Sequence, residues 1–304
     1  MANSGIKIFA PACISMHYMG LKDLSVALDN PGNEIIAHID DKNISAKIEL
    51  YSNEKNDLHK TKEIVIDITN DFLKYIDSHK GVRFEILNRI PFDAGLGQIE
   101  AAITGSIVAI NDVLKSHLEK EEIFDFIIKK IPEYDIEISP SIIAANLFGG
   151  IILYNKNTTN PIQKIYSPQG INFTILLMKR DTNPHLLEKI DSRSLYNQSS
   201  DIALLIKGFM ISDLDLIADA LRNNEFESII TKNDQLYNDI KTISLNNGAY
   251  STGFTHLGES IVIFNSNTLI HEINSMEIEK YLTSKKLNFK IVNSQINLNG
   301  MYKY

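Results

Sequence analysis

The chain has 304 residues, a formal net charge of −8 and a single cysteine, Cys13. Its length and an apolar content of 44% predict one large globular domain or two medium ones with a substantial core. The negative charge argues against nucleic acid as a partner, and no apolar run is long enough for a membrane span or a signal segment. One cysteine excludes an intramolecular disulfide and a cysteine-based zinc cluster, so we expect a cytoplasmic protein.

The first 80 residues are rich in β-branched segments. Their alternation predicts strands at residues 6–10, 34–39, 46–51 and 64–67, and helical spacing of apolar residues predicts a helix at 70–76. An irregular loop is expected at residues 11–20. His17 and Tyr18 in that loop have two interpretations, contact with a ligand or simple packing against the protein.

A glycine-containing turn between a strand and a helix is the centre of the sequence. The strand is expected at residues 82–87 and the helix at about 98–118, with Pro91, Gly95 and Gly97 between them. Glycines let the backbone turn tightly and approach a ligand closely. The free N–H groups and the positive end of the helix would face that ligand. This shape is that of an anion cradle, and the usual anion is a nucleotide phosphate.

The side chains around this turn do not suit a phosphate. Asp93 and Glu100 are carboxylates, and Gln98 and Ile99 stand where a phosphate loop offers a hydroxyl to Mg²⁺. A carboxylate about 5 Å from a phosphate charge costs roughly 3 kcal/mol at an effective dielectric constant of about 20. Glu100 could instead satisfy the helix N-terminus by itself. The alternative is therefore an ordinary strand–turn–helix corner.

The middle of the chain predicts two more helices and a domain boundary. The helices are expected at residues 121–131, ended by Pro132, and at 139–149, followed by a strand at 150–154. No Pro- or Ser-rich linker separates the two halves. We therefore place the boundary near residue 155, between domains of residues 1–155 and 156–304.

The second half mixes strands and helices without a regular βαβ repeat, which favours an α+β fold. Strands are expected at 172–178, 260–264 and 289–292, and helices at 201–210, 212–220, 226–245 and 270–282. The eight histidines show no His-x-x-x-His or His-Glu-x-x-His spacing, and no Gly-x-Ser-x-Gly elbow occurs. We expect no metal site of those kinds.

Four segments, in order and suitably spaced, resemble the GHMP small-molecule kinase superfamily, and homoserine kinase in particular. Residues 9–20, with 29–34 behind them, resemble its N-terminal substrate block. Residues 91–102 resemble its phosphate loop, Pro-x-x-x-Gly-Leu-Gly-Ser-Ser-x-Ala. Residues 142–150 resemble its Asp-Asn-Val-Ala-Pro-x-Leu-x-Gly-Gly run, and residues 248–260 its C-terminal glycine motif. The tail at 297–300 also has a counterpart, so the similarity spans essentially the whole chain.

This resemblance implies an N-terminal domain like ribosomal protein S5 domain 2, a C-terminal ferredoxin-like domain and a ligand cleft between them. For an active member it implies ATP and Mg²⁺ as cofactors, and a homodimer. The implied reaction converts ATP and L-homoserine to O-phospho-L-homoserine, in threonine biosynthesis.

The resemblance also implies the positions of the site. The phosphate loop falls on Pro91, Ala94, Gly95, Leu96, Gly97 and Gln98. The substrate cleft falls on Met16, Lys22, Ser139 and His256. The candidates for catalytic work are Asp23, one residue after the family's Gly-Phe-Asp aspartate, and Glu133, two residues out of register with its magnesium-binding glutamate.

Many family side chains are replaced at these positions. Met16 stands for the substrate-binding Asn, Lys22 for the aspartate, and Gln98 and Ile99 for the two loop serines. The His, Asp and Asn before the Gly-Gly turn fall on Ser139, Ser141 and Ile142, and the substrate-binding arginine falls near Ile230. Removing one such transition-state contact costs about 2.7–4 kcal/mol. Several losses together would leave little phosphoryl transfer.

Three hypotheses follow. The first is a catalytically degenerate member, a pseudokinase or rewired protein that binds a metabolite or a partner. The second is an active homoserine kinase in which Asp23, Thr104, Ser106 and Glu133 stand in for the missing groups. The third is a different enzyme that uses Lys22 and His256 in the cleft.

Overall fold

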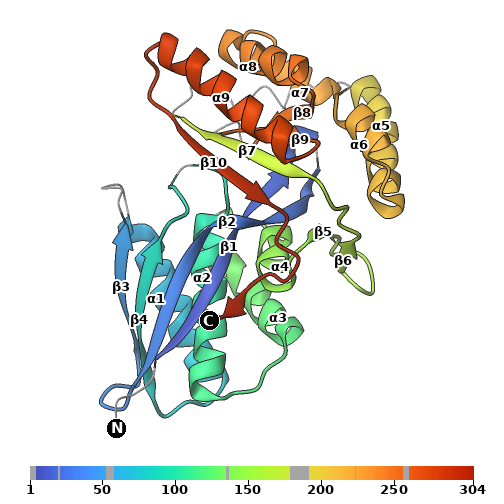
Figure 1. The fold of residues 1–304 in the computed structure, drawn as a ribbon. Helices are drawn as coiled ribbons and strands as arrows, with labels where there is room; N and C mark the ends of the chain where they lie inside the picture. The colour runs from blue at the N-terminus through green and yellow to red at the C-terminus, as the bar shows by residue number, and fades with distance from the viewer. Residues whose placement is uncertain are drawn as a thin grey trace.

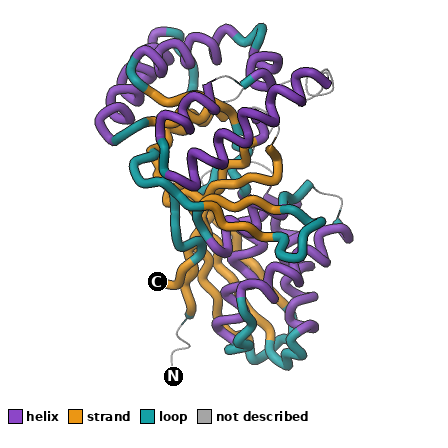
Figure 2. The backbone as a smooth tube through the Cα atoms, turned by 90° about the vertical axis from the view of Figure 1, so that its right-hand side faces the viewer, coloured by secondary structure: helices purple, strands orange, loops and turns teal. Residues whose placement is uncertain are grey.

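The computed structural model describes residues 5–19, 21–52, 58–92, 94–134, 137–178, 192–222, 224–255 and 260–304. Two β-sheets lie one above the other, and each is covered by its own helices (Figures 1 and 2). The expected α+β two-domain architecture is confirmed. Within the described residues, no helix combines the length and apolar character needed to cross a bilayer.

The first sheet has seven strands within the described residues. They are β1 (Ile6–Met16), β2 (Leu21–Asp40), β3 (Ala46–Ser52), β4 (Gly81–Asn88), β5 (Ile151–Tyr154), β6 (Ile162–Ile165) and β11 (Tyr302–Lys303). Their order is β11-β1-β2-β4-β3, with the β5–β6 hairpin paired to β2. The expected loop at 11–20 is largely strand, because β1 continues to Met16 and pairs with β2 through two register shifts.

Helices cover one face of this sheet (Figure 2). They are α1 (Leu58–Tyr75), α2 (Gln98–Leu114), α3 (Lys120–Lys130) and α4 (Pro140–Phe148). Short 3₁₀ turns lie at His17–Met19 (η1), after β1, and at Ile131–Glu133 (η2), after α3. Helix α2 lies against β1 and β2. A Cβ atom on Gly105 would lie 2.5 Å from Ile35 Cδ1, so a glycine is what lets α2 pack this closely.

The strand expected at residues 64–67 is wrong, because these residues belong to α1. Ile64, Val65, Ile68 and Phe72 are all buried, which is one apolar face of a helix rather than an alternating strand. β-branched residues favour strands only weakly, and tertiary packing decides here.

The second sheet is antiparallel, with the order β10-β7-β9-β8. Its strands are β7 (Asn172–Leu177), β8 (Ala249–Phe254), β9 (Ser260–Asn265) and β10 (Lys290–Gln295). The helices around it are α5 (Ser192–Ile211), α6 (Leu214–Arg222), α7 (Glu225–Thr231), α8 (Gln235–Asn246) and α9 (Thr268–Ser284). The single helix expected at 226–245 is two helices, because the Asp234 side chain accepts the N–H of Tyr237 and starts α8.

The C-terminal tail returns from β10 to the first sheet (Figure 1). Asn297 pairs with the backbone of Ala27 and Gly150, and the N–H of Met301 donates to Asn146. The boundary expected near residue 155 falls in the turn between the paired strands β5 and β6. The first sheet thus extends through β6 and also takes β11 from the far end of the chain.

Candidate functional site

The turn before α2 has the backbone of a cradle. Gly95 and Gly97 both have positive φ, at 63° and 72°. Gly97 is the N-cap of α2 and offers no side chain for capping. The turn, with Glu100, Glu137 and Ile142, lines a cavity of about 170 Å³. All six expected loop residues, Pro91, Ala94, Gly95, Leu96, Gly97 and Gln98, line this cavity.

A carboxylate of the protein itself occupies the positive end of α2. Glu100 is buried, with 8% of its surface exposed, and its Oε1 accepts the N–H of Ser139 at 3.2 Å. The carboxylate also accepts the N–H of Glu100 itself. Burial raises the pKa of Glu100, these two hydrogen bonds lower it, and the charge of Glu137 raises it further. The chain's own carboxylate thus already accepts one of the free N–H groups at the start of α2, that of Glu100.

Ile142 closes the cradle from the other side. A Cβ atom on Gly97 would lie 2.6 Å from Ile142 Cγ2, so the close approach that this glycine permits is used by the protein's own side chain. Ile142 is itself buried in the first turns of α4.

The Gln98 side chain ties the turn to its surroundings. Its Nε2 donates to Asn88 Oδ1 at 3.1 Å, and its Oε1 accepts from the Thr61 hydroxyl at 3.5 Å. The turn's own carbonyls are also engaged. Leu96 O accepts the N–H of Cys13, and Ala94 O accepts the hydroxyls of Thr255 and Ser260 at 2.7 and 3.0 Å. Thr255 and Ser260 belong to the second domain, so these two bonds hold the turn to that domain.

Buried hydroxyls stand where the resemblance places the family's acidic residue. Ser139 Oγ lies 3.0 Å from Ser141 Oγ, which lies 2.8 Å from Ser25 Oγ. Thr104, proposed as a stand-in, donates to the backbone oxygen of Glu100, and Ser106 is fully buried in α2. These groups fill the core beside the turn, and neither Thr104 nor Ser106 lines the cavity.

The other expected site residues are dispersed. Glu133 is exposed and pairs with Lys130 at 3.1 Å, and Lys130 also pairs with Asp71. Asp23 is half-buried, and its charge raises the pKa of Tyr154 after the larger effect of burial. Met16 is fully buried. Asp93, His256 and the side chain of Lys22 lie outside the described residues.

The loop after β1 reaches into the second domain. Tyr18 in η1 is fully buried, and its backbone oxygen accepts from Asn224 Nδ2 at 2.7 Å. Its ring covers Gly253, where a Cβ atom would lie 2.6 Å from the ring, and contacts the rings of Phe254 and Phe264. Of the two interpretations of Tyr18, the described residues support packing.

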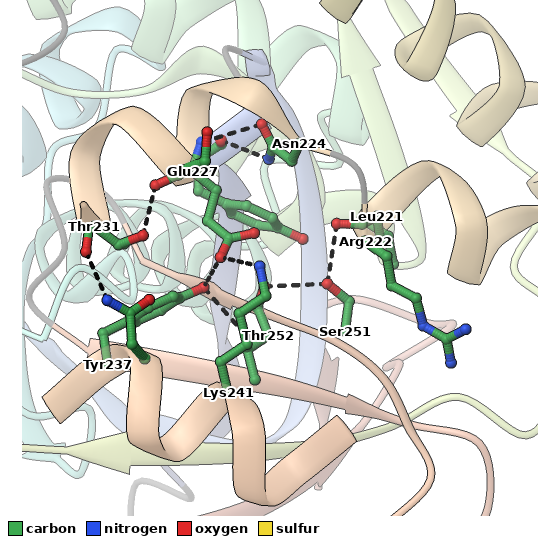
Figure 3. Close-up of polar contacts among 12 residues, drawn as sticks. Leu221, Arg222, Asn224, Glu227, Thr231, Tyr237, Lys241, Ser251 and Thr252 are labelled. Atoms are coloured by element: carbon green, nitrogen blue, oxygen red, sulfur yellow. Dashed lines mark hydrogen bonds and ion pairs between the residues drawn. The ribbon is translucent and has the colours of Figure 1, made fainter. Parts of the chain in front are cut away.

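Beside Tyr18 lies a buried charged cluster (Figure 3). Glu227 is fully buried, with its Oε1 2.6 Å from Lys241 Nζ and 2.8 Å from the Tyr237 hydroxyl. The Thr252 hydroxyl lies 3.2 Å from that of Tyr237, whose single proton goes to Glu227, so Thr252 is the donor in this second bond. Burial raises the pKa of Glu227, although Lys241 and Tyr237 oppose this. The hydroxyl of Tyr18 and the second oxygen of Glu227 have no hydrogen-bond partner within the described residues.

Sequence reasoning missed this cluster. Glu227, Tyr237 and Lys241 belong to no motif, and Tyr18 joins them from more than 200 residues away. The available signal was the spacing of Tyr237 and Lys241, which places both on one face of α8. Among the described residues, no group of three or more His, Cys, Asp or Glu side chains is placed to hold a metal ion.

Comparison with known proteins agrees with the fold. No protein-family model matches the chain. A homoserine kinase of Clostridium botulinum (strain Eklund 17B / Type B) is 25% identical over 272 residues, or 86% of this chain and 85% of that protein. A homoserine kinase of Sulfurisphaera tokodaii is 24% identical over 203 residues, or 64% of this chain and 66% of that protein.

Solved structures extend the likeness to the whole fold. A homoserine kinase from Cytophaga hutchinsonii has a TM-score of 0.87 at 20% identity, covering 100% of this chain and 98% of that one. The L. major mevalonate kinase in complex with R-mevalonate has a TM-score of 0.77 at 13% identity, covering 96% of each chain. The chain therefore shares the fold of these homoserine kinase and mevalonate kinase structures, and its sequence is similar to homoserine kinases over most of its length.

Proposed function

We propose that this chain is a homoserine-kinase-like protein that has lost efficient phosphoryl transfer and serves as a metabolite- or partner-binding protein. The observation that carries this proposal is Glu100, whose buried carboxylate takes the helix N-terminus where a nucleotide phosphate would sit. A phosphate brought within about 5 Å of that charge would lose roughly 3 kcal/mol at an effective dielectric constant of about 20. Ile142, packed over Gly97, adds a steric obstacle.

The alternative is an active homoserine kinase. Two observations favour keeping it: the relatives named above are homoserine kinases, and the turn retains two glycines with positive φ. The candidate residues Asp23 and Glu133 would then have to act on the substrate or on Mg²⁺. Glu133 is held in a surface ion pair, so this alternative requires it to leave Lys130.

Calorimetric titration with MgATP, with and without L-homoserine, separates the two proposals. We expect no binding in the micromolar range for the wild type, and no phosphate transfer to homoserine in a coupled assay. Glu100→Gln keeps an acceptor for Ser139 but removes the charge, so it should bind MgATP at least about tenfold more tightly, which corresponds to 1.4 kcal/mol.

Glu277→Gln is the matched control, since it removes one carboxylate from an exposed ion pair with Lys280 on α9, and it should not change MgATP affinity. Micromolar MgATP binding by the wild type, with turnover of homoserine, would establish the alternative. Equal affinities of the wild type and Glu100→Gln would show that Glu100 is not the obstacle.

We further propose a cytoplasmic homodimer, with a domain boundary between β6 and β7. Light scattering behind a sizing column would test the dimer, because a mass near 34.3 kDa would indicate a monomer. The proposed boundary can be tested by limited proteolysis, which should cut between residues 165 and 172 if the two sheets are separate units.

A further inference from the structure

A second cavity, of about 440 Å³, lies between the two domains. One wall is the bend of β2 at Asn30 and Pro31 with the end of β4 at residues 88–91, and the other is β10 at residues 290–293. This volume is within the usual range for small-molecule sites. Pro91 also lines the cavity of the turn, so the two cavities adjoin there.

The charged side chains that line this interdomain crevice are both cations. Lys290 is exposed on β10, and its ammonium has no hydrogen bond or ion pair in the described part of the chain. Arg89 stands on the opposite wall, with its Nη2 3.0 Å from Glu34, which also pairs with Lys7 at 2.9 Å. The two cations that line the crevice stand out in a chain whose net charge is −8, although Glu34 offsets part of the charge of Arg89.

Asp29, the residue before Asn30 of the crevice wall, has its hydrogen-bond partners outside the crevice. Asp29 Oδ1 accepts the hydroxyl of Ser294 and the N–H of Gln295, both at 2.8 Å, and Asp29 does not line the crevice. Among the described residues, no carboxylate lines the crevice.

The walls are held in place before any ligand arrives. Asn33 Oδ1 accepts the N–H groups of Arg89 and Ile90 at 3.0 and 3.2 Å, which fixes the end of β4. Asn30 Nδ2 donates to Asn293 O at 3.1 Å and so joins the two walls. Partly exposed apolar side chains, Pro91 and Ile291, are also part of the lining. The crevice thus combines an apolar surface with two cations on a preformed frame.

We propose that this crevice binds a small phosphate monoester with an apolar body, whose phosphate lies between Arg89 and Lys290. A phosphate monoester carries about −1.5 to −2 charges at pH 7, opposite in sign to the two cations that line the crevice. Guanidinium and ammonium groups are the usual side-chain partners of phosphate. The site lies outside the turn before α2, so it does not depend on the proposed loss of kinase activity.

Titration calorimetry with phenyl phosphate tests the proposal, with inorganic phosphate and phenol as the two halves of the probe. We expect phenyl phosphate to bind more tightly than either half, and binding to weaken as salt is added. Lys290→Glu should reduce its affinity about tenfold or more, because attraction becomes repulsion. Lys207→Glu makes the same charge change on exposed α5 and should leave the affinity within about twofold.

A third variant separates the crevice from the turn. Ile99→Glu adds a carboxylate to the cavity of the turn and should leave binding of phenyl phosphate unchanged. Absence of binding by the wild type would overturn the proposal, as would equal losses in Lys290→Glu and Lys207→Glu. Binding that is lost in Ile99→Glu but kept in Lys290→Glu would place the phosphate on the turn and overturn it too.

Discussion

Buried charges are costly, and two of the buried carboxylates in the described part of the chain, Glu100 and Glu227, have different partners. Glu100 is held by backbone N–H groups at a helix start, whereas Glu227 is held by Lys241 and Tyr237. Removing either partner of a buried pair leaves an uncompensated charge, which is far more costly than replacing both. The pair Glu227–Lys241 therefore constrains the identity of both residues.

The pKa shift of Glu227 predicts how stability depends on pH. Burial raises its pKa in the folded protein, so between about pH 4.3 and that raised value the folded state binds more protons than the unfolded state. The resulting stability is present below the unfolded pKa and is lost as the pH rises. Glu227→Gln lacks this titration, so the free energy of unfolding of the wild type minus that of the variant should fall with rising pH.

Urea denaturation of both proteins across this range measures that difference. Glu279→Gln, an exposed glutamate on α9, is the control and should show no such trend. A difference that grows with rising pH would mean that Lys241 outweighs burial and lowers the pKa of Glu227.

At the scale of elements, α2 is the helix on which the site is built. Its start makes the turn's cradle, and its small residues let it lie against β1 and β2. Gly105 is the point of closest approach, since an added Cβ would lie 2.5 Å from Ile35 Cδ1 and 3.0 Å from Ala10 Cβ. The position of the turn therefore depends on how near α2 can come to the sheet.

Gly105→Leu should destabilise the protein by about 1–3 kcal/mol or more, because the added side chain overpacks the interface with the sheet. Ile35→Ala alone should also destabilise, by about 2–5 kcal/mol, through the cavity it leaves. The double variant should lose less stability than the two single variants combined, since the new leucine can fill the cavity left by Ile35→Ala. Chemical denaturation of the four proteins measures this coupling, and strict additivity would argue against the contact.

Elements with one dominant local signal could be predicted from the sequence. The strand expected at residues 82–87 and the helix expected at about 98–118 carry apolar alternation, two glycines between them and a run of small residues. Both are confirmed, although the helix ends at Leu114. The strand expected at residues 64–67 is wrong because three consecutive β-branched residues, followed by one aspartate, are compatible with both a strand and one turn of a helix. The sequence predicts one helix where α7 and α8 are separate, because Asp234 is recognisable as the N-cap of α8 only from its hydrogen bond with Tyr237.

At the scale of the whole molecule, several contacts among the described residues join the two sheets. Asn224 holds the backbone of Tyr18, and Thr255 and Ser260 hold Ala94. Asn30 bonds to Asn293 of β10, and the tail after β10 pairs with the first sheet. Such contacts between distant segments leave no local pattern in a single sequence. For that reason the glycines of the turn could be predicted, whereas the charged cluster beside Tyr18 and the interdomain crevice could not.

The tail junction gives a test of this joining. Gly149 and Gly300 meet there, and a Cβ on Gly300 would lie 2.6 Å from both Gly149 N and Leu147 O. Gly300→Ala should therefore cost about 1–3 kcal/mol of overpacking, in addition to about 1–2 kcal/mol for an L-residue at φ +70°. Calorimetric unfolding should show a lower Tm and, if the tail detaches, separate transitions for the two sheets.

Gly170→Ala is the matched control for that variant. Gly170 also has a positive φ, of 93°, but its nearest neighbour to an added Cβ is Ser266 O at 3.8 Å. Gly170→Ala should therefore lose stability only through backbone strain, and it should keep the wild-type number of unfolding transitions. Equal losses in the two variants would mean that the close meeting of Gly149 and Gly300 is not what binds the tail to the first sheet. A larger loss in Gly300→Ala, with split unfolding, would show that the tail makes the two domains unfold as one unit.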